Sequence, residues 1–137
     1  MRDRIQELAA LFVLMPSWTD RYNYLIELGN ALRPMPVAFK VPENRIVCNS
    51  QLHFYVYYVN DICHIEAEAG TPIPQGLAAL LHTLCNGITR QELHNDLPLL
   101  EDFLHQTGLP DNLTLTRREA LGRMLGKIKK SCQNILR

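Results

Sequence analysis

The sequence predicts an α+β fold in which a small antiparallel β-sheet is covered by helices. Positions 51–59 alternate apolar and polar residues, turn at Asn60-Asp61 and return over 62–68, which is the pattern of a β-hairpin with one buried face. Apolar residues at helical spacing occupy the chain on both sides of this hairpin. Because the chain has 137 residues, of which 47% are hydrophobic, we expect one domain over residues 1–137.

Two helices are predicted before the hairpin. The first covers residues 5–15 and ends near Pro16. Ser17 or Thr19 is suited to cap the second, which continues to about Arg33. Prolines then interrupt the chain over residues 34–42, and an unstructured connection of this length is uncommon and often functional.

Helices are also predicted after the hairpin. Leucines at helical spacing follow Thr71-Pro72 and indicate a central helix that ends at Asn86-Gly87. Thr89-x-x-Glu92 is a capping-box pattern for a short helix, and Pro98 is expected to begin a separate helix that ends at Gly108.

The last and longest helix is expected to follow the capping-box pattern Thr116-x-x-Glu119. Its predicted buried face carries five apolar residues: Leu121, Leu125, Ile128, Cys132 and Ile135. A solvated helix face accounts for the basic residues near its end, Lys127, Lys129, Lys130 and Arg137.

Composition argues against several classes of partner. Fourteen basic and fourteen acidic residues cancel, so bulk charge indicates binding to neither nucleic acid nor a membrane surface. The sequence shows no signal-peptide pattern and no run of about 18 apolar residues, the length that a spanning helix needs. We therefore expect a cytoplasmic protein.

The four cysteines, Cys48, Cys63, Cys85 and Cys132, include no C-x-x-C pair, so the common zinc and dithiol signatures are absent. In a reducing compartment they are expected to be free thiols. A zinc site from Cys63-His64 and His82-x-x-Cys85 is conceivable, since positions i and i+3 share a helix face. The two pairs lie on different predicted elements, however, and no further ligand spacing supports them. We predict neither a metal nor a cofactor.

Cys48 is the strongest candidate for chemistry. A loop over residues 40–45 precedes it and the first hairpin strand follows, so the thiol is expected where a rigid sheet holds it and a loop leaves it accessible. The alternative is that Cys48 is a small buried hydrophobic residue, as free cysteines usually are.

Other catalytic patterns are absent from the sequence, including the P-loop, H-E-x-x-H and G-x-S-x-G. The five histidines are spread over different predicted elements, and we assign none as a catalytic base. Glu66 and Glu68 share one strand face, which a solvated edge explains better than acid–base catalysis.

Four motifs in order carry a family resemblance: Trp18-x-x-Arg21-Tyr22-x-x-Leu25-Ile26-Glu27-Leu28-Gly29-x-x-Leu32, then Asn44-x-Ile46-x-Cys48-x-Ser50-x-Leu52, then Gln75-Gly76-Leu77, and finally Leu113-Thr114-Leu115-Thr116-Arg117-Arg118-Glu119-Ala120-Leu121. Together they resemble the SufE family, small sulfur-acceptor partners of cysteine desulfurases in iron–sulfur cluster assembly. The resemblance covers nearly the whole chain and implies the SufE/IscU-like form of the α+β fold.

This chain departs from the family pattern near the cysteine. The family glycine before the cysteine is Val47, the tryptophan of the following strand is His53, and Ala120 replaces a glycine in the last motif. Valine has no ready access to positive φ and stiffens the loop. These departures suggest a divergent member, such as a CsdE-like acceptor that serves a different desulfurase and sulfur pathway.

The resemblance implies that Cys48 takes persulfide sulfur from a pyridoxal-phosphate-dependent cysteine desulfurase, SufS- or CsdA-like, stimulates it and passes the sulfur to a scaffold such as SufB. It also implies a role for Arg117, at the start of the last helix, where a cation and backbone N–H groups favour a nearby thiolate. The protein would then be a sulfur-transfer partner rather than a stand-alone enzyme.

Two alternatives stay open. One is a non-catalytic interaction module of the same fold that binds a partner through residues 34–42. The other is a small enzyme with its own substrate, although no acid, base or cofactor motif accompanies the thiol. Arg117 also has a simpler interpretation as a surface residue in a first helical turn.

Overall fold

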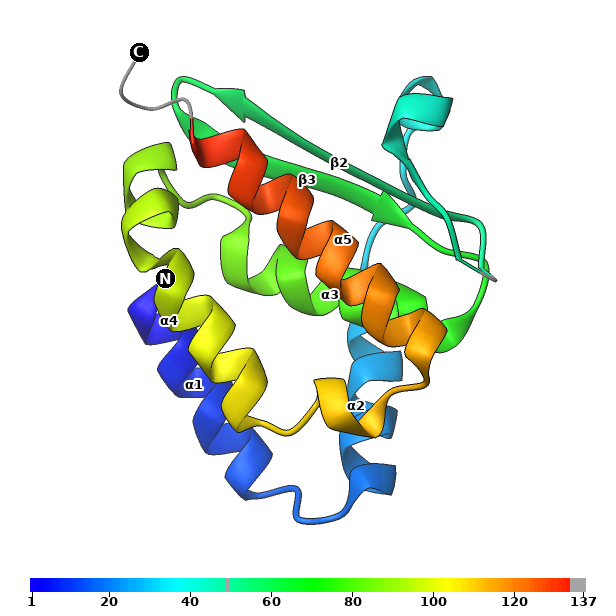
Figure 1. Ribbon diagram of the computed structural model, residues 1–137, viewed down its shortest axis with the longest axis vertical. Coiled ribbons are helices and arrows are strands. Elements are labelled where there is room, and N and C mark those ends of the chain that lie inside the picture. Colours follow the sequence, from blue (N-terminus) through cyan, green and yellow to red (C-terminus); the bar gives the residue numbers. More distant parts are fainter. Residues whose placement is uncertain (49, 134–137) are drawn as a thin grey trace.

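The computed structural model describes residues 1–48 and 50–133, and it confirms the predicted α+β class (Figure 1). Two helices precede the strands: α1 (Arg2–Val13) and α2 (Trp18–Ala31). The described strands form one antiparallel sheet in the order β1 (Arg45–Ile46), β2 (Leu52–Val59) and β3 (Ile62–Glu68). Three helices follow: α3 (Pro72–Cys85), α4 (Arg90–Gln106) and α5 (Leu115–Cys132). The connection over residues 34–42 contains one short 3-10 helix, Val37–Phe39, and meets another, Pro42–Asn44.

The predicted hairpin is confirmed, with its turn at Asn60 and Asp61. Both residues have positive φ, 52° and 62°, as a two-residue turn between twisted strands requires, and Asn and Asp tolerate this region better than most residues. Because successive side chains of a strand point to opposite faces of the sheet, every second residue of β2 and β3 faces the helices. Phe54 of β2 and Cys63 of β3 are fully buried on the inner face, whereas Tyr57 and His64 stack against each other on the other face.

Helices α3 and α5 cover the inner face of the sheet, and α3 is the most deeply buried helix (Figure 1). Helix α2 crosses α3 where Gly29 and Gly76 meet. A Cβ atom on Gly76 would lie 2.4 Å from the carbonyl oxygen of Leu25, so glycine is what allows the two backbones to approach. This contact fixes the N-terminal half of α3 and the segment that leads into it.

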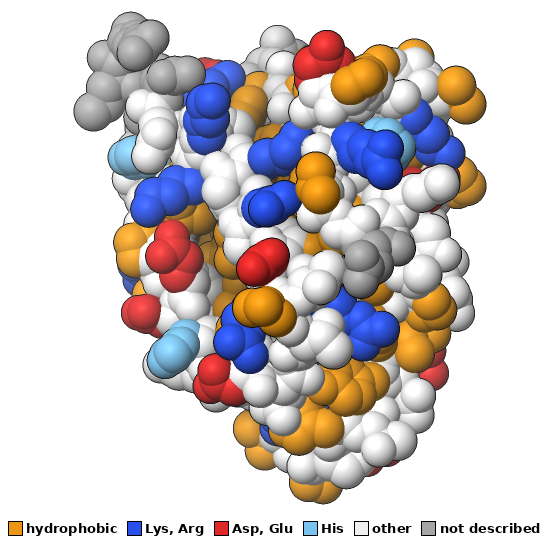
Figure 2. All heavy atoms as spheres, turned by 45° about the vertical axis from the view of Figure 1, so that its right-hand side comes forward, with side chains coloured by type: hydrophobic (Ala, Val, Ile, Leu, Met, Phe, Trp, Pro, Cys, Tyr) orange, Lys and Arg blue, Asp and Glu red, His pale blue; other side chains and the backbone are white. Residues whose placement is uncertain are grey.

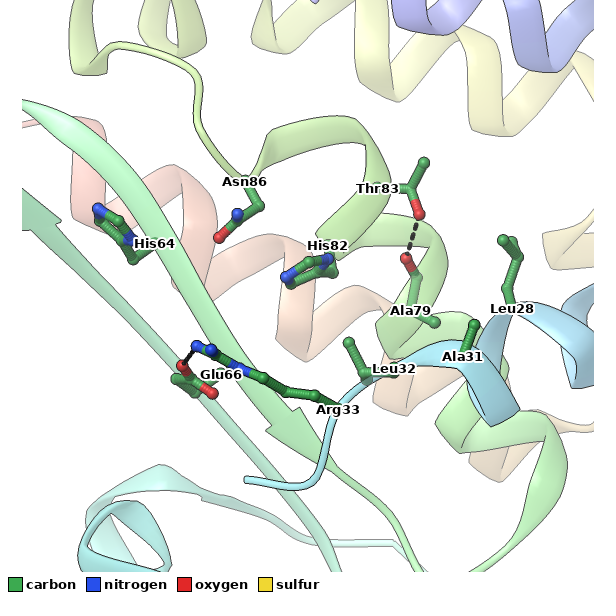
Figure 3. A pocket seen from close by; sticks show the side chains of 10 residues that line it. All are labelled: Leu28, Ala31, Leu32, Arg33, His64, Glu66, Ala79, His82, Thr83 and Asn86. Carbon is green, nitrogen blue, oxygen red and sulfur yellow. Dashed lines mark hydrogen bonds and ion pairs between the residues drawn. The ribbon is translucent and has the colours of Figure 1, made fainter. Parts of the chain in front are cut away.

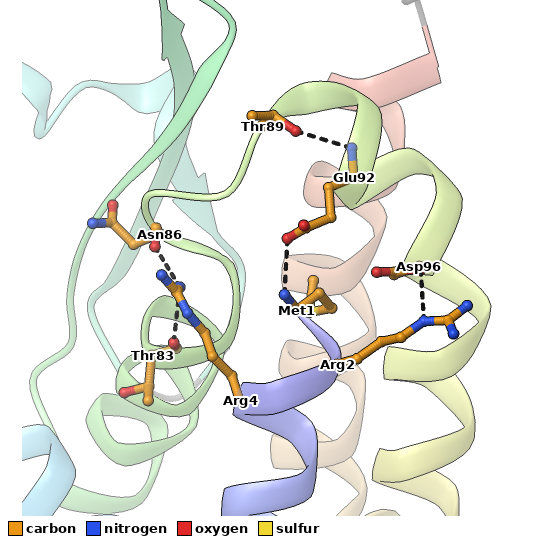
Figure 4. A network of polar contacts seen from close by, with 8 residues as sticks. All are labelled: Met1, Arg2, Arg4, Thr83, Asn86, Thr89, Glu92 and Asp96. Atoms are coloured by element: carbon orange, nitrogen blue, oxygen red, sulfur yellow. Dashed lines mark hydrogen bonds and ion pairs between the residues drawn. The ribbon is translucent and has the colours of Figure 1, made fainter.

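Polar contacts join α1 to α3 and α4 (Figure 4). The Arg4 guanidinium donates to the backbone oxygens of Asn86, at 2.5 Å, and Thr83, at 3.3 Å, near the end of α3. The Met1 amino group donates to Glu92 of α4 at 2.8 Å. Because the last carbonyls of α3 lack partners within the helix, the Arg4 contacts also cap it.

One predicted helix boundary is wrong. Pro98 does not separate two helices, because α4 runs through it as one helix of 17 residues. Pro98 is exposed, whereas Leu97 and Leu100 on either side of it are buried. Packing of this apolar face outweighs the single backbone hydrogen bond that proline removes.

The cap predicted at Thr89 is confirmed, since its hydroxyl accepts a hydrogen bond from the Glu92 backbone N–H at 3.1 Å, whereas the Glu92 carboxylate pairs with the Met1 amino group. The expected start of α2 at Ser17 is confirmed by the same kind of contact, to the Asp20 N–H. On α5, Ile128 and Cys132 are buried as expected. Ile135 and Arg137 lie outside the described residues.

Candidate functional site

Cys48 lies in the loop between β1 and β2, at the end of the sheet, as the sequence predicts. The pairing of Ile46 with Leu52 closes this loop at its base. The thiol is half-buried, packs against the hydrophobic core and donates a hydrogen bond from Sγ to the carbonyl oxygen of Ser50 at 3.0 Å. The side chain thus points inward at rest, although the loop that carries it lies at the surface.

Ser50 anchors the loop on its C-terminal side. Its buried hydroxyl accepts hydrogen bonds from the backbone N–H groups of Gly70, at 2.9 Å, and Thr71, at 3.0 Å, just before α3. The family pattern marks this serine, but sequence reasoning gave it no role. The structure shows that it holds the Cys48 loop against the start of the central helix.

Cys48 and Arg117 line the same cavity, which has a volume of about 320 Å³. Around the thiol, the loop and the start of α3 contribute Ser50, Thr71 and Pro74. Across from them, the start of α5 contributes Thr114, Thr116, Arg117 and Ala120. Residues that carry hydroxyl groups and a guanidinium therefore line the Cys48 cavity together with Pro74 and Ala120, and such groups can stabilise an anionic sulfur atom.

The prediction that Thr116 caps the last helix is wrong. Thr114, and not Thr116, caps the helix: its hydroxyl accepts from the Arg117 N–H at 3.4 Å, and its carbonyl accepts from the Arg118 N–H at 2.9 Å. The helix begins two residues earlier than expected, so Arg117 is its third residue rather than its first and still lies in the first turn. The positive end of the helix dipole and the arginine side chain thus both face the cavity that contains Cys48.

The other three cysteines lie in the core. Cys63, Cys85 and Cys132 each have an exposed fraction of 0%. Burial raises the pKa of Cys63 to about 11 and also raises the pKa values of Cys85 and Cys132, because desolvation disfavours a thiolate. At neutral pH these three thiols stay protonated and inaccessible. Among the four, only Cys48 is a partly exposed residue.

A second cavity, of about 400 Å³, lies between the end of α2, α3 and β3, away from the residues of the Cys48 cavity (Figure 3). Glu66 lines this cavity, and the expectation that it lies at a solvated edge is wrong, because Glu66 is only 4% exposed. The Arg33 guanidinium, which reaches it from the end of α2, pairs with its carboxylate at 2.5 Å. His82 lines the same cavity, and burial lowers its pKa because it disfavours the imidazolium form.

The zinc alternative finds no support in the structure. Cys63 faces the core and His64 the other side of the sheet, because neighbouring strand residues point in opposite directions. Within residues 1–48 and 50–133, no group of three or more His, Cys, Asp or Glu residues could hold a metal ion. In the same part of the chain, no helix has the length and apolar composition to cross a membrane.

Comparisons with known proteins agree with this architecture. A family model described as SufE, Fe-S metabolism associated domain, matches residues 6–132. An uncharacterised SufE-like protein of Rhizobium meliloti is 29% identical over 130 residues, which is 91% of each chain. The cysteine desulfuration protein SufE of Wigglesworthia glossinidia brevipalpis is 30% identical over 129 residues, covering 88% of this chain and 83% of that protein.

The fold is also similar to a solved one. The solution structure of a hypothetical protein from Thermus thermophilus matches with a TM-score of 0.66 at 17% identity, over 93% of this chain and 95% of that one. At this level of identity the likeness concerns the fold alone. Together with the family match over residues 6–132, the findings show that the chain belongs to the SufE family.

Proposed function

We propose that this protein accepts sulfur on Cys48 from a cysteine desulfurase and transfers it for iron–sulfur metabolism. Family membership supports the general role in sulfur transfer, and the name of the Wigglesworthia relative, cysteine desulfuration protein, points the same way. The observation that carries the proposal is that Cys48 shares its cavity with Arg117 at the start of α5.

The proposed chemistry is one sulfur exchange without net oxidation. The desulfurase holds the sulfur as a persulfide on its own cysteine. The Cys48 thiolate attacks the terminal sulfur of that persulfide, so a new bond to Cys48 Sγ forms while the donor's sulfur–sulfur bond breaks. The donor cysteine leaves as a thiolate with the bonding pair, and the persulfide is now on Cys48. No metal, external oxidant or reductant enters the balance.

Arg117 would act on the charges that this exchange creates. The attacking thiolate and a deprotonated persulfide product each carry a negative charge, and a guanidinium beside them lowers their energy. The hydroxyls of Thr71, Thr114 and Thr116, which line the cavity, can donate to the same sulfur atoms. A persulfide held inward is also protected from reductants and oxidants.

The partner in this scheme is a pyridoxal-phosphate-dependent cysteine desulfurase of the SufS or CsdA type. The recipient would be an iron–sulfur scaffold such as SufB, or another acceptor if the protein serves a CsdE-like pathway. We propose the cytoplasm as its compartment, since four free thiols are typical of proteins in a reducing environment.

Mass spectrometry after incubation with a desulfurase and free cysteine tests the proposal. We expect a gain of about 32 Da on Cys48, the mass of one sulfur atom, and no gain in Cys48→Ser, which folds normally because the change in volume is small. A variant in which Cys63, Cys85 and Cys132 are all replaced should still accept sulfur if it folds, because these thiols are inaccessible.

Two results would contradict the proposal. A folded protein with Cys48 as its sole cysteine that binds the desulfurase but gains no sulfur would favour the interaction module. Sulfur found on another cysteine in the wild type would make the assignment of Cys48 wrong.

A further inference from the structure

We propose that Arg123 and Lys127 are positioning residues that hold the Cys48 loop closed, and that an acidic side chain of the desulfurase opens the loop by pairing with Arg123. The second half of this inference rests on the proposed function, whereas the first half concerns the isolated protein. Neither residue belongs to the motifs that resemble the family pattern.

The geometry of α5 supports the closed state. The Arg123 guanidinium donates from Nη1 to the carbonyl oxygen of Val47 at 3.2 Å. Val47 directly precedes Cys48 in the chain. Lys127, one helical turn further on, donates from Nζ to the carbonyl oxygen of Glu43 at 3.0 Å. Two cations on one face of α5 thus hold the segment that leads into the loop.

The loop therefore has two anchors of different character. On the C-terminal side, Ser50 is buried and makes neutral hydrogen bonds to backbone N–H groups. On the N-terminal side, the Arg123 contact is solvent-exposed and its donor is charged. The contacts of Arg123 and Lys127 are both exposed and can be reached by a protein that docks on the surface. Arg123 binds the residue directly before Cys48, so the Arg123 contact is where docking can release the loop.

The charge of the surface indicates what such a partner offers. Helix α5 carries six basic residues and one acidic residue, although the whole chain has a net charge of zero. Figure 2 shows Lys and Arg side chains spread over one face of the molecule. Val47 and Leu115, which are 73% and 66% exposed, are next in the chain to residues that line the Cys48 cavity and add apolar contacts. A complementary partner surface is acidic around a small apolar centre.

An exchange of hydrogen-bond partners would then couple docking to opening. A carboxylate pairs with guanidinium through two charge-assisted hydrogen bonds, which are stronger than one bond to a backbone carbonyl. When a desulfurase carboxylate binds Arg123, the Val47 carbonyl loses its donor. Lys127 still holds Glu43, before β1, but the residues beside Cys48 are then held only at Ser50. Cys48 can then turn outward towards the persulfide of the partner.

Alkylation of the isolated protein tests the closed state. We expect Arg123→Ala to raise the rate of iodoacetamide labelling at Cys48 about fivefold, the effect of losing one modest hydrogen bond that opposes opening. Arg123→Lys, which keeps a cationic donor, should restore most of the slow labelling. Lys129→Ala is the matched control: it removes one charge from α5, but Lys129 lines a groove against α4 and should not alter labelling.

Labelling sites are assigned by mass spectrometry, and urea unfolding checks that each variant is folded. Equal labelling of wild type and folded Arg123→Ala would overturn the closed-state proposal. So would an equal rise in Lys129→Ala, because the effect would then come from net charge rather than from the contact with Val47.

The release step is tested by adding a catalytically inactive desulfurase. It should speed up labelling of the wild type towards the rate of Arg123→Ala, and speed up Arg123→Ala itself by less than about twofold, because that variant has already lost the contact that docking would break. Equal acceleration of both proteins would overturn the role of an acidic partner residue. Labelling of the isolated protein needs no sulfur, so a failure of sulfur acceptance would leave the result for the closed state intact.

Discussion

Arg21 and Arg117 both belong to the motifs that this chain shares with the SufE pattern, but they have different surroundings. The Arg21 guanidinium donates to the carbonyls of Met15, Phe12 and Thr107 and stacks 4.8 Å from the Trp18 ring. It joins the ends of α1 and α4 to the start of α2. The Arg117 side chain instead lines the Cys48 cavity and makes no hydrogen bond or ion pair to the described residues. One arginine serves the fold, and the other is available for chemistry.

We expect Arg117→Ala to lower the rate of sulfur transfer to Cys48 at least tenfold, roughly 1.4 kcal/mol of transition-state stabilisation. The reason is the loss of the cation that faces the developing negative charge on sulfur. Single-turnover transfer from a persulfide-loaded desulfurase measures the rate of sulfur transfer to Cys48. Arg117→Lys should retain part of this rate.

Arg21→Ala provides the converse control. It should reduce the free energy of unfolding by about 2 kcal/mol, because three carbonyls lose their donor, while transfer per folded molecule stays unchanged. If Arg117→Ala instead lowered stability and left transfer intact, Arg117 would be a structural residue.

Among the helices and strands, the crossing of α2 and α3 depends on close backbone contact. Gly76→Ala should destabilise the protein by about 2–3 kcal/mol, because the added Cβ meets the Leu25 carbonyl and the helices must separate. Gly122 in α5 is the matched control, since a Cβ there would meet nothing within 4 Å. Gly122→Ala should stabilise by roughly 0.5–1 kcal/mol through helix propensity.

Urea unfolding measures both changes. A Gly76→Ala variant as stable as the wild type would mean that α2 can shift without cost. Labelling of Cys48 in this variant provides a second measurement, because Thr71 and Pro74, at the start of α3, line the cavity. We expect labelling to increase when the start of α3 moves.

The start of α5 shows how one element places a functional group. Two overlapping patterns compete there, Thr114-x-x-Arg117 and Thr116-x-x-Glu119. A glutamate at the third helical position favours the second pattern locally. The structure uses the first, with Leu113 buried before the cap and Thr116 lining the cavity. Burial of the preceding leucine thus sets the helix start and, with it, the position of Arg117.

For the molecule as a whole, the buried thiols make stability depend on alkaline pH. Unfolded cysteines ionise near about pH 8.5, whereas the pKa of buried Cys63 is raised to about 11 and those of Cys85 and Cys132 are also raised. Below about pH 8.5 both states hold these protons, so these thiols add no dependence of stability on pH. Above it the unfolded state loses protons that the folded state keeps, and the free energy of unfolding falls as pH rises.

Urea unfolding at about pH 7.5, 9 and 10 should show this decline, at up to roughly 1.4 kcal/mol per pH unit for each thiol. Cys63→Ala should be less stable at the lowest of these pH values, because it leaves a cavity, but its decline with pH should be shallower. The same slope in both proteins would show that Cys63 does not contribute to the dependence on pH.

Local patterns in the sequence were enough to predict much of the fold. Alternation over positions 52–58 and the Asn60-Asp61 turn predicted the hairpin and its buried face. Helical spacing predicted α1, α2 and α3, and a cap residue marked the start of α2. The position of Cys48 at the end of the sheet followed from the same pattern, because a loop-to-strand boundary is visible in the sequence. These features depend on residues that are close in the chain, so their physics is local.

Tertiary packing set the features that depend on residues far apart in the chain. Burial of one face carried α4 through Pro98, and Arg33 and the neighbouring helices covered Glu66. Packing of α5 across the sheet brought Arg117 to the Cys48 cavity and Arg123 to the Val47 carbonyl. No spacing in the sequence could predict these contacts, because the register of a helix against a distant loop is set by the side chains that fill the core between them. The roles of Cys48 and Arg117 stay predictions that the sulfur-transfer experiments test.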